Sequence, residues 1–98
     1  MERHWDLIVV GGGLAGLTAA ATAAGSGASV LVLDAQQLGG RAVTDDVDGY
    51  RFNRGAHALY KGAVGRGVLA RLGVAVHGAP PPIAGSLVRR GDRVGALG

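Results

Sequence analysis

The chain has 98 residues, 48% of them apolar and 17% charged, so it is at most one small domain and too apolar to be intrinsically disordered. It has no cysteine, which excludes disulfide bonds, thiolate metal sites and a cysteine nucleophile and is compatible with a cytoplasmic location, where we place the protein. The formal net charge is +3, but the basic residues are scattered without interleaved aromatic residues, so we expect no nucleic-acid partner.

Residues 7–33 carry no charge, and they divide into three pieces of different pattern. Short β-branched stretches stand at 7–10 and 29–33, and an Ala-rich stretch at 14–24 lies between them. Six glycines and a middle of Ala and Thr argue against a transmembrane span or a secretory signal. Strands covered on both faces read as continuous apolar runs, so the pattern predicts strand, helix and strand.

The Ala-rich helix has small apolar residues at spacings of three and four, which give it a narrow face for the sheet. This face consists of Leu17, Ala20, Ala21 and Ala24. Gly25 and Gly27 follow as signals for the end of the helix.

A glycine-rich turn with the spacing G-x-G-x-x-G joins the first strand to the helix. Its first glycine permits a tight turn, its third lets a pyrophosphate approach the backbone, and its last lets the helix pack closely on the strands. The anion then lies at the helix N-terminus, where N–H groups and the dipole favour negative charge. We expect a cofactor to be bound by Gly11, Gly12, Gly13, Leu14, Ala15 and Gly16.

Asp34 ends the second predicted strand, 18 residues after Gly16. A carboxylate there can accept hydrogen bonds from ribose hydroxyls, and it would repel a 2′-phosphate. The alternative is a solvated carboxylate that caps the next turn. With the glycines before it we favour the ribose role. These residues predict a bound dinucleotide, but they do not separate FAD from NAD.

The next two segments separate these cofactors. Gly39, Gly40 and Arg41 follow the second strand, with Thr44 three residues on, and residues 49–57 contain a Gly-aromatic-x-Phe-Asn-x-Gly pattern. Over residues 6–60 the chain thereby resembles the superfamily of FAD-dependent amine oxidases, phytoene desaturases and protoporphyrinogen oxidases. The resemblance implies an α/β fold, namely the N-terminal βαβ portion of a Rossmann-like FAD-binding domain of the glutathione reductase type. It also implies FAD as the cofactor.

The resemblance further implies that Gly40 and Arg41 contact the FAD phosphates, and that Ala56 and His57 run past the flavin ring. A guanidinium at this place can engage phosphate oxygens bidentately, whereas the alternative for Arg41 is an exposed loop residue in a surface salt bridge. Asn53 stands where the family usually has Asp, so no role that needs a carboxylate is carried over to it.

The rest of the chain carries weaker signals. We predict a hairpin around residues 46–49, a helix at 61–72, a short strand at 74–76 and a second hairpin around 90–92. Residues 1–78 are then the N-terminal part of the FAD-binding domain. Residues 79–98 are a connection and the start of a hairpin that leads into a remainder absent from this chain.

The function implied by the resemblance is that of an FAD-dependent oxidoreductase, which in its full length oxidises a C–C or C–N bond of a small apolar or amine substrate. No titratable pair is placed as acid and base, and three isolated histidines make no metal site, so we assign neither catalytic residues nor metal ligands. We expect the fragment alone to be inactive. Two alternatives remain. One is an NAD(P)-binding dehydrogenase module, which should lack the Gly-Gly-Arg segment, and the other is a non-enzymatic protein like the Rab GDP-dissociation inhibitors, in which the phosphate-binding glycines should be eroded.

Overall fold

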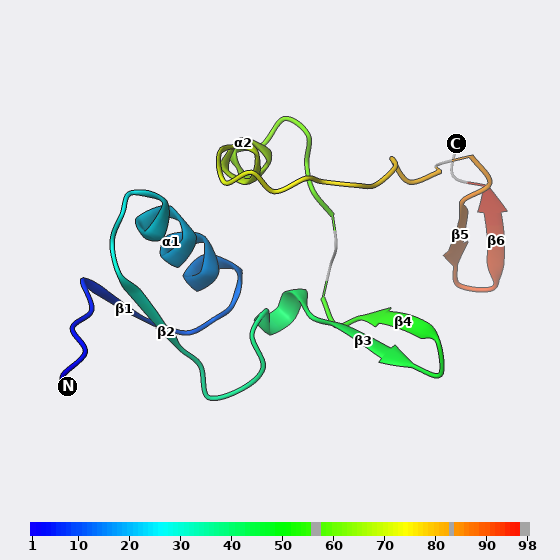
Figure 1. Ribbon diagram of the computed structural model, residues 1–98. Helices are drawn as coiled ribbons and strands as arrows, with labels where there is room; N and C mark the ends of the chain where they lie inside the picture. Colours follow the sequence, from blue (N-terminus) through cyan, green and yellow to red (C-terminus); the bar gives the residue numbers. More distant parts are fainter. Residues whose placement is uncertain (56–57, 83, 97–98) are drawn as a thin grey trace.

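The computed structural model describes residues 1–55, 58–82 and 84–96, and it begins with a parallel β-α-β unit (Figure 1). The elements in chain order are β1 (Leu7–Val10), α1 (Leu14–Gly25), β2 (Val30–Leu33), η1 (Gly40–Ala42), β3 (Thr44–Val47), β4 (Tyr50–Asn53), α2 (Val64–Arg71), β5 (Leu87–Arg90) and β6 (Arg93–Ala96). β1 pairs with β2 in parallel, while β3–β4 and β5–β6 are antiparallel hairpins. This arrangement confirms the α/β fold class.

Helix α1 covers one face of the β1–β2 pair, in which Leu7 lies opposite Val30 and Val10 opposite Leu33. The predicted helix face is right for Leu17, which is half-buried, and for Ala20, which is 7% exposed. It is wrong for Ala21 and Ala24, which are exposed, and it leaves out Ala23, which is half-buried. The reason is that Gly16 packs against Gly11 and Val9 at the end of β1, so the contacting face follows the spacing of four and three from that glycine.

The end of α1 is set by hydrogen bonds to its last carbonyls. Gly27 has φ +92°, and its N–H donates to Ala24 O at 3.0 Å, while the N–H of Ala28 donates to Ala23 O at 3.2 Å. This pair of bonds around a left-handed glycine is a Schellman motif. It returns the chain to β2 at the point where the sequence predicts the helix to end.

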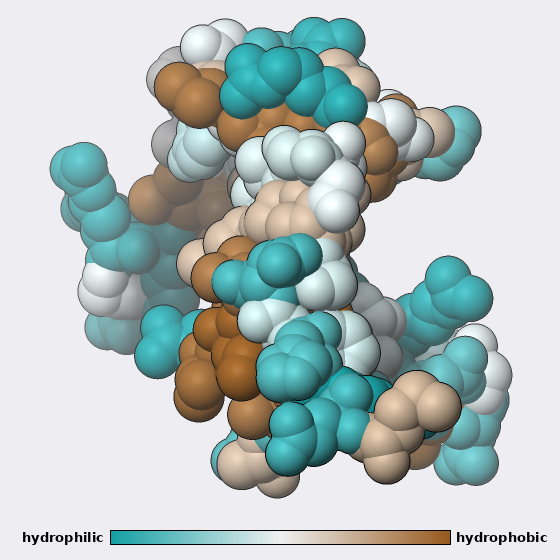
Figure 2. Space-filling model, turned by 60° about the vertical axis from the view of Figure 1, so that its left-hand side comes forward, coloured by the Kyte–Doolittle hydropathy of each residue, from teal (hydrophilic) through white to brown (hydrophobic). Residues whose placement is uncertain are grey.

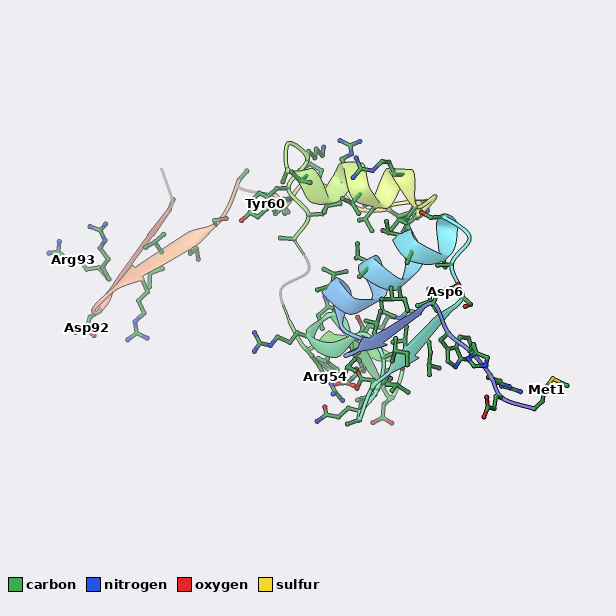
Figure 3. All side chains as sticks on the ribbon, turned by 90° about the vertical axis from the view of Figure 1, so that its left-hand side faces the viewer. Met1, Asp6, Arg54, Tyr60, Asp92 and Arg93 are labelled. Carbon is green, nitrogen blue, oxygen red and sulfur yellow. The ribbon has the colours of Figure 1, made fainter. Side chains whose placement is uncertain are left out.

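The starts of β1 and β2 are held together by Asp6 and Ser29. The Asp6 carboxylate accepts hydrogen bonds from the N–H and the Oγ–H of Ser29, both at 2.8 Å. The N–H of Asp6 lies 3.0 Å from both the Oγ and the carbonyl oxygen of Ser29. Since Asp6 precedes the first paired residues, these bonds extend the connection between the two strands beyond the end of their pairing; Asp6 is labelled in Figure 3.

Both predicted hairpins form. The β3–β4 turn places Asp48 (φ 52°) and Gly49 (φ 81°) in the left-handed region, as a two-residue hairpin turn requires. The helix predicted at 61–72 is shorter, since α2 begins only at Val64, after Gly62. The strand predicted at 74–76 is wrong: the N–H of Val74 closes the end of α2 by donating to Leu69 O at 2.9 Å, and no described segment pairs with these residues.

Much of the apolar surface is exposed in the part of the chain that the structure describes. Its buried apolar side chains are Ala20 and Val43, whereas Ile8 is 52% and Val10 83% exposed on the sheet. Brown apolar patches are accordingly visible on the space-filling surface (Figure 2). The β5–β6 hairpin stands apart from α1 and the β1–β2 pair (Figures 1 and 3). Among the described residues, no helix is long and apolar enough to cross a bilayer.

The contact of Gly16 with the first turn gives a stability prediction. A Cβ on Gly16 would overlap the carbonyl oxygen of Gly11 and lie 3.3 Å from Val9 Cγ1. Because backbone atoms cannot rotate away, we expect Gly16→Ala to lower the free energy of unfolding by about 1–3 kcal/mol in urea titrations. The matched control is Gly25→Ala in the same helix, whose Cβ meets nothing within 4 Å and should cost no stability. Equal stability of the two variants would contradict the packing argument.

Asp6 gives a prediction on pH. The N–H and hydroxyl of Ser29 lower the pKa of Asp6 below its ordinary value. The stabilisation is therefore fully present above the unfolded-state pKa of about 4 and is lost as the pH falls through the lowered pKa of the folded state. We expect Asp6→Asn to be less stable than the parent at pH 7, with a difference that shrinks below about pH 4. Denaturant unfolding at several pH values measures this, and Ser29→Ala should show part of the same loss; a pH-independent difference would contradict it.

Candidate dinucleotide site

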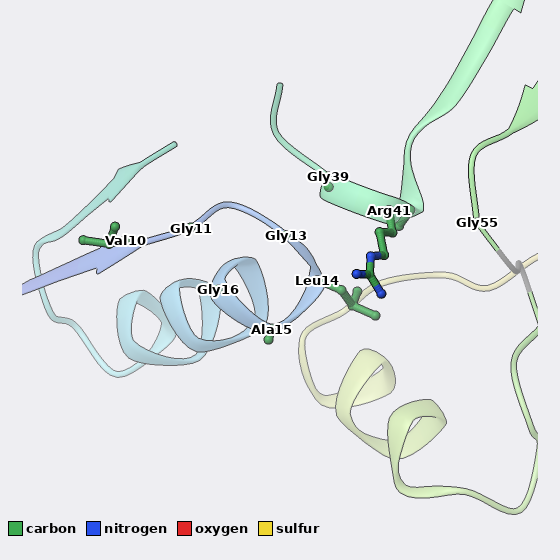
Figure 4. A pocket seen from close by; sticks show the side chains of 11 residues that line it. Val10, Gly11, Gly13, Leu14, Ala15, Gly16, Gly39, Arg41 and Gly55 are labelled. Atoms are coloured by element: carbon green, nitrogen blue, oxygen red, sulfur yellow. The ribbon is translucent and has the colours of Figure 1, made fainter. Parts of the chain in front are cut away.

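A cavity of about 730 Å³ opens at the N-terminus of α1 (Figure 4). It is lined by the turn from β1 into α1, by the region of η1, and by Gly55, which follows β4. Its size lies within the range of small-molecule binding sites in proteins. The lining residues are Val10, Gly11, Gly13, Leu14, Ala15, Gly16, Gly39, Gly40, Arg41, Ala42 and Gly55.

The first turn of α1 presents backbone N–H groups to this cavity. Gly13 is the N-cap residue, and the first helical hydrogen bond runs from the N–H of Leu17 to Gly13 O at 2.9 Å. Within α1, all of which the structure describes, no side chain caps the first turn and no acidic residue lies in it. The N–H groups of residues 14–16 therefore precede the first helical bond, and they and the helix dipole favour an anion.

Each glycine of the turn has a distinct structural reason. Gly11 has φ +104° and its N–H donates to Leu33 O at 2.7 Å, so the strand pairing continues up to a sharp turn. Gly16 has no room for a Cβ against Gly11. A Cβ on Gly13 would meet no atom within 4 Å, so the space in front of this residue is open. That open space lies at the helix N-terminus, where an anion is favoured.

Asp34 is exposed, does not line the cavity, and is hydrogen-bonded to the glycine turn. Its Oδ1 accepts a hydrogen bond from the N–H of Gln36 at 2.7 Å, and its Oδ2 accepts one from the N–H of Gly12 at 2.6 Å. These two bonds, the first more than the second, lower the pKa of Asp34. The carboxylate thus caps the turn after β2, as the alternative interpretation held. It also has acceptor capacity left for hydroxyl donors, because each carboxylate oxygen has two lone pairs.

The Gly39–Arg41 segment lies directly over the glycine turn. The N–H of Gly39 donates to Gly12 O at 2.7 Å, and a Cβ on Gly40 would lie 3.2 Å from Gly13 Cα. Both glycines of the segment have left-handed φ values, 106° and 55°. The Arg41 side chain extends from η1 toward the start of α1 (Figure 4). A guanidinium is therefore placed beside the positive end of the helix dipole.

The base of the β3–β4 hairpin is held by side-chain bonds close to the site. Thr44 Oγ1 donates to Asn53 Oδ1 at 2.8 Å, so the amide oxygen accepts the bond that a carboxylate oxygen could accept at this place. Arg54 Nε forms an ion pair with Asp45 Oδ2 at 2.8 Å. This pair lowers the pKa of Asp45, first through the hydrogen bond from Arg54. These bonds hold the end of β4 beside the start of β3, next to the point where Gly55 contacts Arg41.

The structure brings most of the predicted site residues to one cavity, seven of them into its lining. Those seven are Gly11, Gly13, Leu14, Ala15, Gly16, Gly40 and Arg41. Gly12 and Asp34 are not in the lining but are hydrogen-bonded to each other, and Ala56 and His57 lie outside the described residues. Sequence reasoning left out four lining residues, although two of them belong to glycine motifs that it had recognised. They are Val10, Gly39, Ala42 and Gly55.

Three named relatives each match a little more than half of the chain. A carotenoid 3,4-desaturase of Haloarcula japonica is 53% identical over 51 residues, 51% of this chain and 10% of that protein. One of the subunits of a limonene dehydrogenase of Castellaniella defragrans is 45% identical over 59 residues, 59% of this chain and 10% of that protein. A pseudooxynicotine dehydrogenase of a Pseudomonas species is 44% identical over 52 residues, 52% of this chain and 10% of that protein. No solved structure matches the chain significantly.

The matched segment is thus about a tenth of the length of each named relative. The relatives confirm the resemblance to desaturase and amine-oxidising enzymes that the Gly-Gly-Arg segment indicates. A model of the NAD(P)-binding Rossmann-like domain matches residues 9–72, which include the whole cavity lining and α2. The chain belongs to the family of NAD(P)-binding Rossmann-like domains.

Proposed function

We propose that this chain binds the ADP part of FAD and belongs to a flavin-dependent oxidoreductase. One observation carries the choice of FAD: the Gly39–Arg41 segment lines the same cavity as the glycine turn of α1. An NAD-binding unit of the usual kind continues from its second strand into another crossover helix. Here β2 is followed by η1 and the β3–β4 hairpin, which bring a guanidinium to the helix N-terminus instead.

The phosphates of FAD would lie in the open space before Gly13. The N–H groups of the first turn of α1 and the guanidinium of Arg41 both border that space, and both favour a diphosphate. No acidic side chain stands in the first turn of α1 to oppose the anion. Glycine at positions 11, 13 and 16 also argues against a relative of the GDP-dissociation inhibitors, in which this turn should be eroded.

Asp34 would bind the adenosine ribose. Hydrogen bonds from Gly12 and Gln36 hold its carboxylate in place and favour the ionised form. An ionised carboxylate accepts bonds from the 2′- and 3′-hydroxyls, and it repels a 2′-phosphate. The site therefore suits a dinucleotide with a free ribose, and Asp34 has both the turn-capping role and the ribose role.

The redox activity is proposed from the relatives. This chain is similar to a carotenoid desaturase, a limonene dehydrogenase subunit and a pseudooxynicotine dehydrogenase. Because these names refer to chemically different compounds, the segment that they share with this chain fits a cofactor-binding role better than substrate selection. Bound flavin supplies the redox chemistry, and the residues of this chain bind and orient it. We propose oxidation of a C–C or C–N bond in a small apolar or amine substrate.

The proposal extends to the division of the chain. Residues 1–78 would form part of the cofactor domain, and residues 79–98 a connection followed by the β5–β6 hairpin. The position of that hairpin, apart from α1 and the β1–β2 pair, supports this division (Figure 1).

An NAD(P)-binding dehydrogenase is the second candidate, and the description of the matching family favours it. The glycine turn and Asp34 would serve NAD as well as FAD, whereas the charge of Asp34 speaks against NADP. Direct measurement of cofactor preference distinguishes the two candidates.

We expect the purified protein to bind FAD, seen as a flavin absorbance spectrum that stays with the protein through gel filtration, and to bind it more tightly than NAD⁺ or NADP⁺. Gly13→Val should abolish this binding, because the new side chain would occupy the open space proposed for the diphosphate. Gly13→Ala is the stability control, since a Cβ on Gly13 meets no protein atom within 4 Å and should leave the fold intact. Preference for NAD⁺ in titrations would replace FAD by the second candidate, and stoichiometric FAD in Gly13→Val would show that the turn is structural only.

Arg41 gives a separate prediction. Arg41→Ala should weaken FAD binding about tenfold to a hundredfold, because a charge-assisted hydrogen bond to the diphosphate is lost. The control is Arg51→Ala, which removes an exposed arginine of β4 that does not line the cavity. Titration of apoprotein with FAD, followed by flavin fluorescence, measures both variants. Equal affinity of the two variants would return Arg41 to the role of a surface loop residue.

A further inference from the structure

We propose that Gly55 is a positioning residue that holds Arg41 in place for the cofactor diphosphate. This inference rests on the proposed function and adds to it a residue that does not itself carry charge. Gly55 follows the β3–β4 hairpin, is half-buried, and lines the cavity together with Arg41. Figure 4 shows the two residues on neighbouring segments at the same side of the cavity.

The absence of a side chain at position 55 is required by Arg41. A Cβ on Gly55 would overlap the carbonyl oxygen of Arg41, and it would lie 3.4 Å from the carbonyl carbon and 3.5 Å from the Cβ of that residue. All three neighbours belong to Arg41, and two are backbone atoms that cannot rotate away. The backbone segments of residues 41 and 55 are therefore in direct contact.

The φ of Gly55 gives no second reason for glycine at this position. Gly55 is not among the residues with a left-handed φ, unlike Gly39 and Gly40. Its φ alone therefore does not require glycine. The cost of a larger residue at position 55 thus comes from its contact with Arg41.

Arg41 cannot simply retreat from a larger residue. On the other side of its segment, Gly39 is bonded to Gly12 O at 2.7 Å and Gly40 lies against Gly13. Two residues after Arg41, the carbonyl of Val43 accepts a hydrogen bond from the N–H of Arg54 at 3.0 Å, and the Val43 side chain is only 8% exposed. The Arg41 backbone is held between the glycine turn and the end of the β3–β4 hairpin.

A methyl group on Gly55 would consequently move the Arg41 backbone, and with it the guanidinium. A charge-assisted bidentate contact depends on geometry, so a small displacement loses much of its strength. Gly62 offers a matched control a few residues further on. Its Cβ would meet nothing within 4 Å, its φ is not left-handed, and it does not line the cavity.

The test is a double-mutant cycle on FAD affinity, measured by flavin fluorescence. We expect Gly55→Ala to weaken binding about tenfold in the parent, approaching the effect of Arg41→Ala, and Gly62→Ala to leave affinity unchanged. In the Arg41→Ala background, Gly55→Ala should cause no further weakening, because the guanidinium that it displaces is already absent. Equal weakening in both backgrounds would show that Gly55 acts on the site independently of Arg41 and would overturn the proposal.

Thermal unfolding without ligand shows whether Gly55→Ala folds. If it does not, Asn53→Ala tests the same contact, because it removes the 2.8 Å bond to Thr44 and so loosens the end of the hairpin that carries Gly55. It should weaken FAD binding about threefold in the parent and leave affinity unchanged in Arg41→Ala, and equal weakening in both backgrounds would overturn the proposal. Failure of the parent to bind any FAD would contradict the proposed function. FAD binding by the parent together with unchanged affinity in folded Gly55→Ala would contradict the role of Gly55 alone.

Discussion

The backbone of Gly12 forms hydrogen bonds through both its N–H and its carbonyl group, and the arrangement of the site depends on these two bonds. Its N–H donates to Asp34 Oδ2 at 2.6 Å, and its carbonyl accepts the N–H of Gly39 at 2.7 Å. One bond fixes the carboxylate after β2, and the other fixes the segment that leads to Arg41. Without a Cβ, Gly12 fits between Asp34 and Leu38, both of which a side chain would meet. Three segments are thereby joined around one buried residue before any ligand arrives.

The close approach of α1 to β1 has the same origin as the cavity. Gly16 allows the first turn of the helix to touch Gly11, so the helix N-terminus lies against the end of the strand. The first turn of the helix, with its N–H groups, therefore borders the cavity. Packing and ligand binding thus depend on the same missing side chain, which is why loss of stability and loss of binding must be measured separately. A substitution at Gly13 can distinguish the two effects, because a Cβ there would meet no protein atom within 4 Å.

Local patterns predicted the elements and most of the site, because the constraints there act within a few residues. Glycines at 11, 13 and 16 define a turn whose geometry is local, and Asp48 and Gly49 define the β3–β4 turn. Contacts between distant segments could not be predicted in this way. The exposure of Ala21 and Ala24 depends on where the helix touches the sheet, and the failure of residues 74–76 to form a strand depends on whether a neighbour exists to pair with them. Gly55 was visible as part of a motif, but its contact with Arg41 appears only when the hairpin is folded.

The charges of the site follow the chemistry of a dinucleotide from one end to the other. Hydroxyl groups donate hydrogen bonds, and the ionised Asp34 lies at the end of β2 to accept them, held by the N–H groups of Gly12 and Gln36. Phosphate oxygens accept, and the donors of the α1 N-terminus and Arg41 border the open space before Gly13. The carboxylate would repel a phosphate if the two regions merged. The two regions stay separate because the N–H of Gly12 holds Asp34 Oδ2 at 2.6 Å, and Asp34 is not among the residues that line the cavity.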